Sequence, residues 1–167
     1  AAGGYRTGMF GKWHLGDNYP YRPFDRGFEH TVAHRGGGVG QTPDFWGNNY
    51  FDDTYFHNGR AQSHLGYCTD IWFQEAMRWI DSVRDEPFFA YIATNVPHYD
   101  WNVRPEWLKP YAEVEPPERA CFYASIERVD WNLGRLLNYL RDRGLDDRTL
   151  LVFLTDNGSD VPGKRTS

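Results

Sequence analysis

Cysteine, basic charge and long apolar runs are all scarce in this sequence. Two cysteines among 167 residues exclude a disulfide scaffold and a cysteine-rich zinc site. Acidic residues outnumber basic ones, 23 to 18, and the net charge of −5 argues against nucleic acid as a partner. No apolar run approaches the roughly 18 residues of a membrane span, so no membrane segment is predicted in this chain.

Aromatic residues and glycine are abundant instead. The 7 Trp, 11 Tyr and 11 Phe make up 17% of the chain, and 40% of it is hydrophobic, which is the composition of a folded globular protein. The length is that of about one domain. Because the first residue is Ala1 and a glycine-rich stretch follows at once, we expect a fragment or a processed chain whose true start lies upstream.

The first half of the chain predicts short elements followed by a helix. Residues 1–65 show no sustained helical period and predict loops and short strands, with Asn58-Gly59 as the tight turn of a hairpin. Thr69 or Asp70 can cap a helix, in which the apolar residues from Ile71 to Val83 recur at about the 3.6-residue spacing and which Pro87 closes. Residues 88–93 (Phe-Phe-Ala-Tyr-Ile-Ala) then predict a buried strand.

A second helix and a second strand are predicted further along. The helix begins at Pro116-Pro117 and ends before Gly144, and residues 149–154 (Thr-Leu-Leu-Val-Phe-Leu) predict another buried strand. Helices alternating with strands indicate an α/β protein with a mostly parallel sheet flanked by helices. Ligands of such sheets bind beyond the carboxyl ends of the strands. His98 and the pair Asp156-Asn157 follow the two predicted strands.

His98 is a candidate for proton transfer. An imidazole titrates near neutral pH, so this side chain could serve as a general acid or base. The alternative is a loop histidine that stacks on its aromatic neighbours Tyr99 and Trp101.

Asp156 and Asn157 are candidates for metal binding. Two adjacent oxygen ligands, followed by Gly158 to allow a sharp turn, suit Ca²⁺ or Mg²⁺. The alternative is a turn in which both side chains bond their own backbone, which is common for this tripeptide. The residue types alone leave both interpretations open.

Lys12 and His14 lie between glycines in residues 11–16. In an extended chain, side chains two positions apart face the same way, so both groups could meet one anion. The alternative is a solvated lysine and a packed histidine.

Three further groups give weaker indications. Residues 34–40 are glycine-rich, but the chain has no Gly-x-Ser-x-Gly nucleophile motif and no helix follows them, so we interpret them as a flexible loop beside the site. Asp52-Asp53 could be a pair of acids, although surface carboxylates in turns are commoner. His30, His57 and His64 show no metal-ligand spacing.

Three motifs resemble those of one family. Residues 4–16 (Gly-Tyr-Arg-Thr-Gly-Met-Phe-Gly-Lys-Trp-His-Leu-Gly) resemble the second signature of the type I sulfatases (arylsulfatase family), with Phe10 where a smaller aliphatic residue is usual. Residues 95–98 resemble the family's Pro-His loop, and residues 155–158 its metal-binding turn. The resemblance covers nearly the whole chain and implies an alkaline phosphatase-like fold, incomplete here. It also implies that residues 1–167 are the central part of the catalytic domain, with the nucleophile region upstream and the C-terminal part missing.

The resemblance also implies roles for the matching positions. Lys12 would contact the sulfate and the nucleophile, His14 would hydrogen-bond the nucleophile's hydroxyl, and His98 would bind sulfate and protonate the leaving alcohol. Asp156 and Asn157 would be two ligands of a Ca²⁺ ion. The implied substrate is a sulfated small molecule or glycan, and the implied location is outside the cytoplasm, in the periplasm, the lysosome or the exterior.

Part of the family's site does not occur in the sequence. The family uses a formylglycine made from Cys or Ser in a Cys/Ser-x-Pro/Ala-x-Arg motif, and neither Cys68, Cys121 nor any serine lies in one. We expect this nucleophile and the remaining metal ligands upstream of Ala1. Lys164 lies closer to Asp156 than the family's second lysine does. The chain alone should therefore be inactive, and strands without neighbours should make it prone to aggregate.

Two other functions are compatible with the residues. A phosphatase, phosphodiesterase or phosphonate hydrolase of the same superfamily would share the metal-assisted chemistry, usually with a second metal, but residues 12–14 favour a sulfatase. A non-catalytic carbohydrate-binding module would stack its aromatic residues on sugars. Trp72 and Trp79 lie at helical spacing, however, and indicate a core instead.

Overall fold

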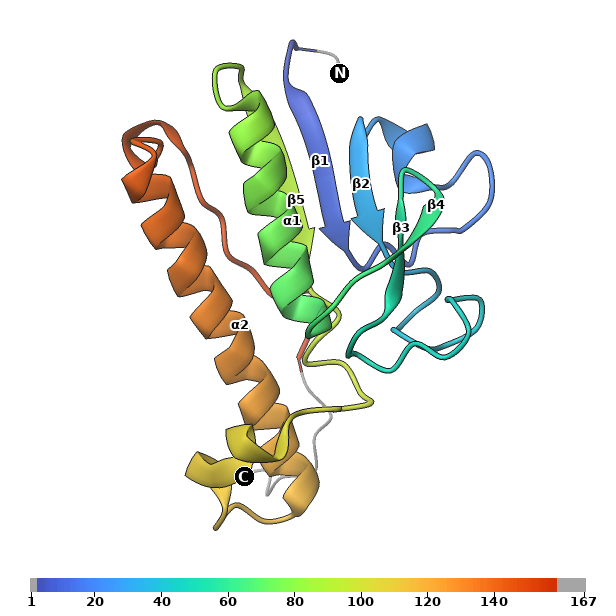
Figure 1. Ribbon diagram of the computed structural model, residues 1–167, viewed down its shortest axis with the longest axis vertical. Helices are drawn as coiled ribbons and strands as arrows, with labels where there is room; N and C mark the ends of the chain where they lie inside the picture. Colours follow the sequence, from blue (N-terminus) through green and yellow to red (C-terminus); the bar gives the residue numbers. More distant parts are fainter. Residues whose placement is uncertain (1–2, 159–167) are drawn as a thin grey trace. The chain divides into compact units, whose positions relative to one another are not determined.

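The structure, a computed structural model, describes residues 3–158 and divides into two compact units between Tyr99 and Asp100. The first unit contains five strands, one α-helix and a 3-10 helix (Figure 1): β1 (Arg6–Gly11), η1 (Pro23–Arg26), β2 (His30–Ala33), β3 (Thr54–His57), β4 (Arg60–Ser63), α1 (Cys68–Val83) and β5 (Phe88–Ala93). The second unit contains η2 (Pro105–Tyr111), α2 (Pro117–Asp142) and η3 (Asp146–Arg148).

The strands form one mixed sheet in the order β4-β3-β2-β1-β5. β1 pairs in parallel with both β2 and β5, whereas β3 and β4 form an antiparallel hairpin that extends the sheet from β2. The register places Gly11 beside both Ala33 and Ala93, so the three parallel strands end at the same edge. The predicted α/β class is confirmed. Lys12 and His14 follow β1, and His98 follows β5, at this shared edge.

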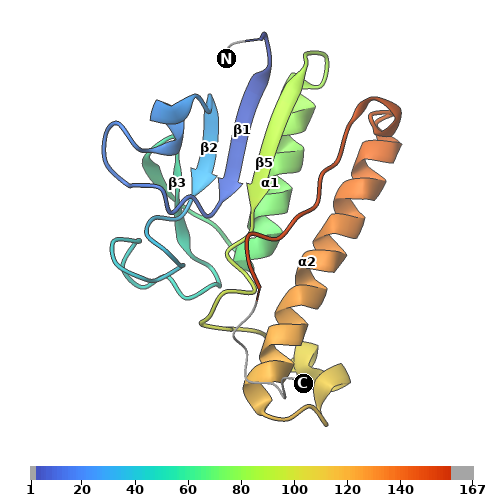
Figure 2. The ribbon, with the colours of Figure 1, turned by 180° about the vertical axis from the view of Figure 1, so that it is seen from behind.

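Helix α1 covers one face of the sheet (Figures 1 and 2). Trp72 and Trp79 on this helix are buried, as the helical spacing predicted. The ring of Trp79 lies 5.8 Å from that of Phe10 in β1, and a Cβ on Gly8 would lie 2.8 Å from Trp79. The absence of a side chain at Gly8 therefore allows the helix to approach the central strand closely.

The hairpin and both helices agree with the sequence analysis. Asn58 and Gly59 have φ angles of 47° and 82° between β3 and β4, the left-handed conformations of a two-residue turn. Helix α1 runs from Cys68 to Val83, so it begins just before the predicted cap at Thr69 or Asp70 and ends before Pro87, as predicted. After α2, Gly144 has a φ of 61° and ends the helix as predicted. No helix of residues 3–158 is long and apolar enough to span a membrane.

The predicted strand over residues 149–154 is wrong for this structure. The segment is irregular, and Leu150, Val152, Phe153 and Leu154 are between 66% and 89% exposed. An apolar run becomes a strand only where a neighbouring strand satisfies its backbone groups. In the described part of the second unit, no strand is present to do so.

Candidate active site

Lys12 follows β1 directly, and its backbone is tied to the end of β5. Its N–H donates a hydrogen bond of 2.7 Å to the carbonyl oxygen of Ala93. Gly11 makes this approach possible, because it has a φ of 110° and a Cβ there would lie 2.0 Å from the same oxygen. The position of Lys12 at the sheet edge is thus set by the backbone.

His14 is exposed and lies against the glycine-rich loop that follows β2. A Cβ on Gly37 would lie 2.8 Å from both Cε1 and Nε2 of the His14 ring. Only a residue without a side chain at position 37 leaves the ring in this place. The glycine-rich stretch therefore lies against the candidate residue His14.

His34 is a candidate that the sequence analysis missed. Its side chain is 2% exposed and lies 6.1 Å from the ring of Trp72. Nδ1 is 2.9 Å from the carbonyl oxygen of Arg35, which only accepts, so Nδ1 carries the proton and Nε2 a lone pair. Nε2 has no partner among the described residues, and burial lowers the pKa of His34. His34 directly follows β2, and this position at the end of a strand could have marked it as a candidate. The sequence analysis did not locate β2 and therefore missed it.

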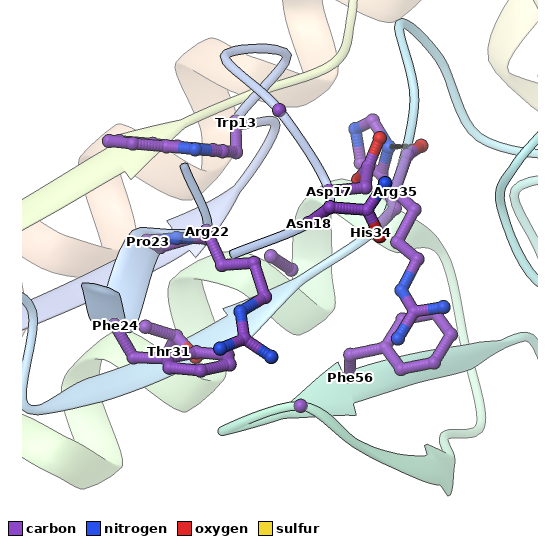
Figure 3. Close-up of a pocket in the computed structure, with 13 residues that line it drawn as sticks. Trp13, Asp17, Asn18, Arg22, Pro23, Phe24, Thr31, His34, Arg35 and Phe56 are labelled. Atoms are coloured by element: carbon purple, nitrogen blue, oxygen red, sulfur yellow. Dashed lines mark hydrogen bonds between the residues drawn. The ribbon is translucent and has the colours of Figure 1, made fainter. Parts of the chain in front are cut away.

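A cavity of about 200 Å³ opens next to the Lys12–His14 loop (Figure 3). The loops after β1 and β2, helix η1 and the β3–β4 hairpin form its walls, to which the following side chains contribute: Trp13, Asp17, Asn18, Arg22, Arg35 and Phe56. In Figure 3 the side chains of Arg22 and Arg35 reach in the same direction from opposite walls. The cavity therefore has charged and polar side chains in its wall, beside the loop that carries Lys12 and His14.

His98 follows β5 at the same edge of the sheet. Its ring is exposed and stacks on Tyr99, with centroids 4.7 Å apart, and Nδ1 faces the carbonyl oxygen of Tyr99. This is the stacked arrangement that the sequence analysis gave as an alternative to proton transfer. In the part of the chain described, no hydrogen bond joins His98 to Lys12 or His14.

The start of the His98 loop is anchored in the core. Asn95 is buried, and its Oδ1 accepts a hydrogen bond of 2.9 Å from the indole N–H of Trp72. The carbonyl oxygen of Asn95 in turn accepts the N–H of His98 at 3.1 Å. The backbone at His98 is therefore held while its ring stays accessible.

Asp156 and Asn157 lie in the second unit, and both are exposed. The N–H of Asn157 donates to Oδ1 of Asp156 at 2.9 Å, and Nδ2 of Asn157 donates to the carbonyl oxygen of Gly158 at 2.6 Å. The local turn, one of the two alternatives, is thus present. Within residues 3–158 no three His, Cys, Asp or Glu side chains are grouped closely enough to hold a metal ion. Lys164 lies outside the described residues.

Asp53 is not a surface carboxylate, contrary to the sequence interpretation. It is 4% exposed, and its carboxylate accepts the N–H groups of Asn49 and Tyr50 and the hydroxyl of Tyr55. Burial raises the pKa of Asp53. Asp52 accepts the N–H of Gly66, so each carboxylate holds a loop around the hairpin.

Two of the three histidines near the hairpin form a pair that their spacing did not reveal. The Nε2 atoms of His57 and His64 lie 3.0 Å apart, and the rings are within 12° of parallel. At this distance one ring donates N–H to the lone pair of the other. His30 lies edge-on to His57 and stacks on Trp79. The contact crosses the hairpin, which explains why linear spacing does not show it.

Comparison with known proteins assigns the chain to a family. The sulfatase family model matches residues 1–166. The chain belongs to the sulfatase family. The resemblance carried by the three motifs is therefore confirmed.

The relatives of this sulfatase chain are longer than it is. An arylsulfatase of Klebsiella aerogenes is 28% identical over 209 aligned positions, covering 93% of this chain and 45% of that protein. Human N-acetylgalactosamine-6-sulfatase is 26% identical, covering 93% of this chain and 31% of that protein. The sulfatase chain thus spans less than half the length of these relatives.

Solved structures share the fold of this sulfatase. Ps i-CgsB in complex with k-i-k-neocarrahexaose is 26% identical with a TM-score of 0.75, covering 85% of this chain and 35% of that one. BT4656 in complex with D-glucosamine-2-N,6-O-disulfate is 18% identical with a TM-score of 0.62, covering 86% of this chain and 46% of that one. The fold is alkaline phosphatase-like, and this chain contains part of it.

Neither cysteine of this sulfatase chain is placed to act as a nucleophile. Cys68 is fully buried at the start of α1, and burial raises its pKa to about 12. Burial also raises the pKa of Cys121. Because the thiolate is the reactive form of cysteine, the raised pKa values lower the thiolate fraction of both residues near neutral pH.

Proposed function

We propose that the protein containing this chain hydrolyses sulfate esters, and that the chain supplies five active-site residues: Lys12, His14, His98, Asp156 and Asn157. The observation that carries the proposal is the sulfatase family match over residues 1–166. The position of Lys12 and His14 immediately beyond β1, at the edge where ligands of α/β sheets bind, supports their assignment. The match to sulfatases also favours a sulfate over a phosphate ester.

The proposed roles follow from the charge that develops during sulfuryl transfer. The Lys12 ammonium stabilises negative charge on the sulfate oxygens, which preorganised cations do effectively. His98 donates a proton to the alcohol oxygen as the bond to sulfur breaks, and its accessible ring allows this contact. His14, held against Gly37, orients the hydroxyl of the nucleophile.

The nucleophile is proposed to be a formylglycine from a part of the protein outside this sequence. Neither cysteine lies in the Cys/Ser-x-Pro/Ala-x-Arg motif that is converted to formylglycine. Burial raises the pKa of both thiols. The curated relatives exceed this chain in length by a factor of two or more, which leaves room for such a segment. The isolated chain should accordingly have no sulfatase activity.

The donor atoms of Asp156 and Asn157 fit a hard cation, for which we propose Ca²⁺. A carboxylate and an amide oxygen are typical ligands of this ion, which takes six to eight oxygens. Two residues supply too few ligands, so the others come from elsewhere in the protein. When bound, the ion neutralises charge on the sulfate.

The test is hydrolysis of 4-methylumbelliferyl sulfate, a panel of sulfated galactosides and 4-methylumbelliferyl phosphate by the full protein. We expect turnover of at least one sulfate ester, and a fall in kcat of about 10²–10³-fold in Lys12→Ala and His98→Ala. Lys109→Ala, an exposed lysine in η2, is the matched control and should retain full activity. Hydrolysis of the phosphate alone would contradict the proposal.

The cation is tested separately by chelation. Treatment with EGTA should abolish turnover, and added Ca²⁺ should restore it. In Asp156→Ala, restoration should need a Ca²⁺ concentration at least about tenfold higher, because one charged ligand is lost. Activity that is indifferent to EGTA would remove the metal from the proposed site.

A further inference from the structure

The cavity beside the Lys12–His14 loop contains two guanidinium groups in different surroundings. Arg22 donates from Nε and Nη2 to Asp25 at 2.7 and 2.9 Å, so its charge is matched and Nη1 is the nitrogen that Asp25 does not engage. Arg35 lies over the ring of Phe56 at 3.9 Å. Within residues 3–158 no carboxylate is within ion-pair distance of Arg35. The Arg35 guanidinium therefore lines the cavity without an ion-pair partner among residues 3–158, although the Asp17 carboxylate also lies in the wall and the Asp44 carboxylate accepts the N–H of Arg35 at 3.0 Å.

The other end of the cavity presents acceptors and an aromatic ring. The Asp17 carboxylate accepts the N–H of Gly36 at 3.2 and 3.3 Å, and Asn18 follows it in the wall. The ring of Trp13 is fixed by a hydrogen bond of 2.7 Å from its N–H to the carbonyl oxygen of Tyr21. Figure 3 shows Asp17 and Asn18 apart from the guanidinium ends of the two arginines.

This distribution of groups matches a charged sugar. A sugar ring offers C–H groups to an aromatic ring, hydroxyl groups to carboxylate and amide oxygens, and any acidic substituent to arginine. Guanidinium groups bind oxyanions through their strongest, charge-assisted hydrogen bonds. Trp13 stands between Lys12 and His14 in the chain, so one wall of the cavity belongs to the loop that carries the residues assigned to ester cleavage.

We propose that this cavity binds a sugar residue with an anionic substituent, a sulfate or a carboxylate, with Arg35 as its principal ligand and Arg22 as a second. The inference rests on the proposed sulfatase function. The substrate is then a glycan that carries an acidic group in addition to the sulfate ester that is cleaved. A sugar whose only acidic group is the sulfate ester being cleaved offers no anion to Arg35.

Isothermal titration calorimetry on the full protein, with galactose, galactose 6-sulfate and galacturonic acid as probes, tests this proposal. Both acidic sugars should bind at least about tenfold more tightly than galactose, because each adds charge-assisted hydrogen bonds. Arg35→Gln should remove most of this difference, and Arg22→Gln part of it. Arg60→Gln, exposed at the start of β4 and outside the cavity lining, is the control and should bind like the unmodified protein.

The probes also separate this proposal from the proposed function. Galacturonic acid contains no sulfate ester, and its binding should persist in Lys12→Ala. A preference for galactose 6-sulfate alone that persists in Lys12→Ala and is lost in Arg35→Gln would identify sulfate as the group recognised in the cavity. Equal binding of the three sugars, or a preference that survives Arg35→Gln, would overturn the proposal even if sulfate esters are hydrolysed. Arg35-dependent binding of galacturonic acid without any ester hydrolysis would instead leave the cavity assignment intact and overturn the sulfatase function.

Discussion

The backbone N–H of Lys12 donates to the carbonyl oxygen of Ala93, and this 2.7 Å hydrogen bond joins the ends of β1 and β5 where the loop that carries Lys12 and His14 begins. The bond continues the parallel pairing in which Gly11 lies beside Ala93. Because the two strands are adjacent, the loops that carry Lys12 and His98 leave the sheet at neighbouring points. Several substitutions test how strictly this arrangement depends on particular residues.

Gly11→Ala should destabilise the fold severely. The new Cβ would lie 2.0 Å from the oxygen of Ala93, and the φ of 110° is itself unfavourable for alanine. Gly66 has the same φ with no atom within 4 Å, so Gly66→Ala isolates the backbone strain. We expect a loss of about 1–2 kcal/mol for Gly66→Ala and at least about 2 kcal/mol more for Gly11→Ala. The free energy of unfolding of both variants is measured by urea titration. Equal losses for Gly11→Ala and Gly66→Ala would show that the ends of β1 and β5 move apart at little cost to admit the Cβ.

Gly37→Ala should impair catalysis more than stability. The added Cβ would lie 2.8 Å from the ring of His14, which must move, whereas the backbone at position 37 has no left-handed strain. A displacement of about 1 Å in a positioned group can lower the rate about 10²-fold. Gly134→Ala in α2, with open space around it, is the control. An unchanged kcat in Gly37→Ala would argue against a role for His14.

Stability should fall on acidification between about pH 7 and pH 5. Burial lowers the pKa values of His30, His57 and His64, so in this range the unfolded chain binds more protons than the folded one. The free energy of unfolding therefore decreases as pH falls through the ordinary histidine range near 6.5. Glu75 opposes this effect at all three rings, and Arg78 adds to it at His64.

The His57–His64 pair should account for part of that slope. His57→Gln and His64→Gln each remove one of two interacting groups, so each should flatten the dependence of the melting temperature on pH. Thermal unfolding of the full protein at pH 5, 6 and 7 measures the effect. A slope that neither substitution alters would place the acid sensitivity elsewhere.

The apolar run of residues 149–154 should drive association of the isolated chain. Leu150, Val152, Phe153 and Leu154 are exposed, and contiguous exposed apolar residues promote aggregation. The double variant Val152→Lys and Phe153→Lys should lower the light scattering of the 167-residue chain several-fold. Leu65 is 88% exposed but lies outside the run, so Leu65→Lys should change little. Similar scattering from all three chains would assign the aggregation to another surface.

Much of the fold was predictable where local signals coincide with tertiary structure. The Asn58-Gly59 turn, the extent of α1 and the end of α2 at Gly144 each depend on a local conformational preference. Strand β1 was not located, because Gly8 and Gly11 weaken its local strand preference. It is a strand because it lies between β2 and β5.

The candidate site was predictable only in part, for a related reason. Lys12, His14 and His98 stand in short motifs, and each follows a parallel strand of the sheet. The lone pair of His34 and the cavity between Arg22 and Arg35 arise where segments distant in sequence meet. Neither has a signature in any single stretch of residues.

The central place of β1 has a consequence for synthesis on the ribosome. Strand β1 emerges before β5, whose Phe88 pairs with Arg6 and follows it by about 80 residues. At roughly 5–20 residues per second, Met9 and Phe10 wait about 4–16 s for that partner, although both are fully buried in the finished sheet. The nascent chain thus presents its most deeply buried strand as a transient binding segment for chaperones.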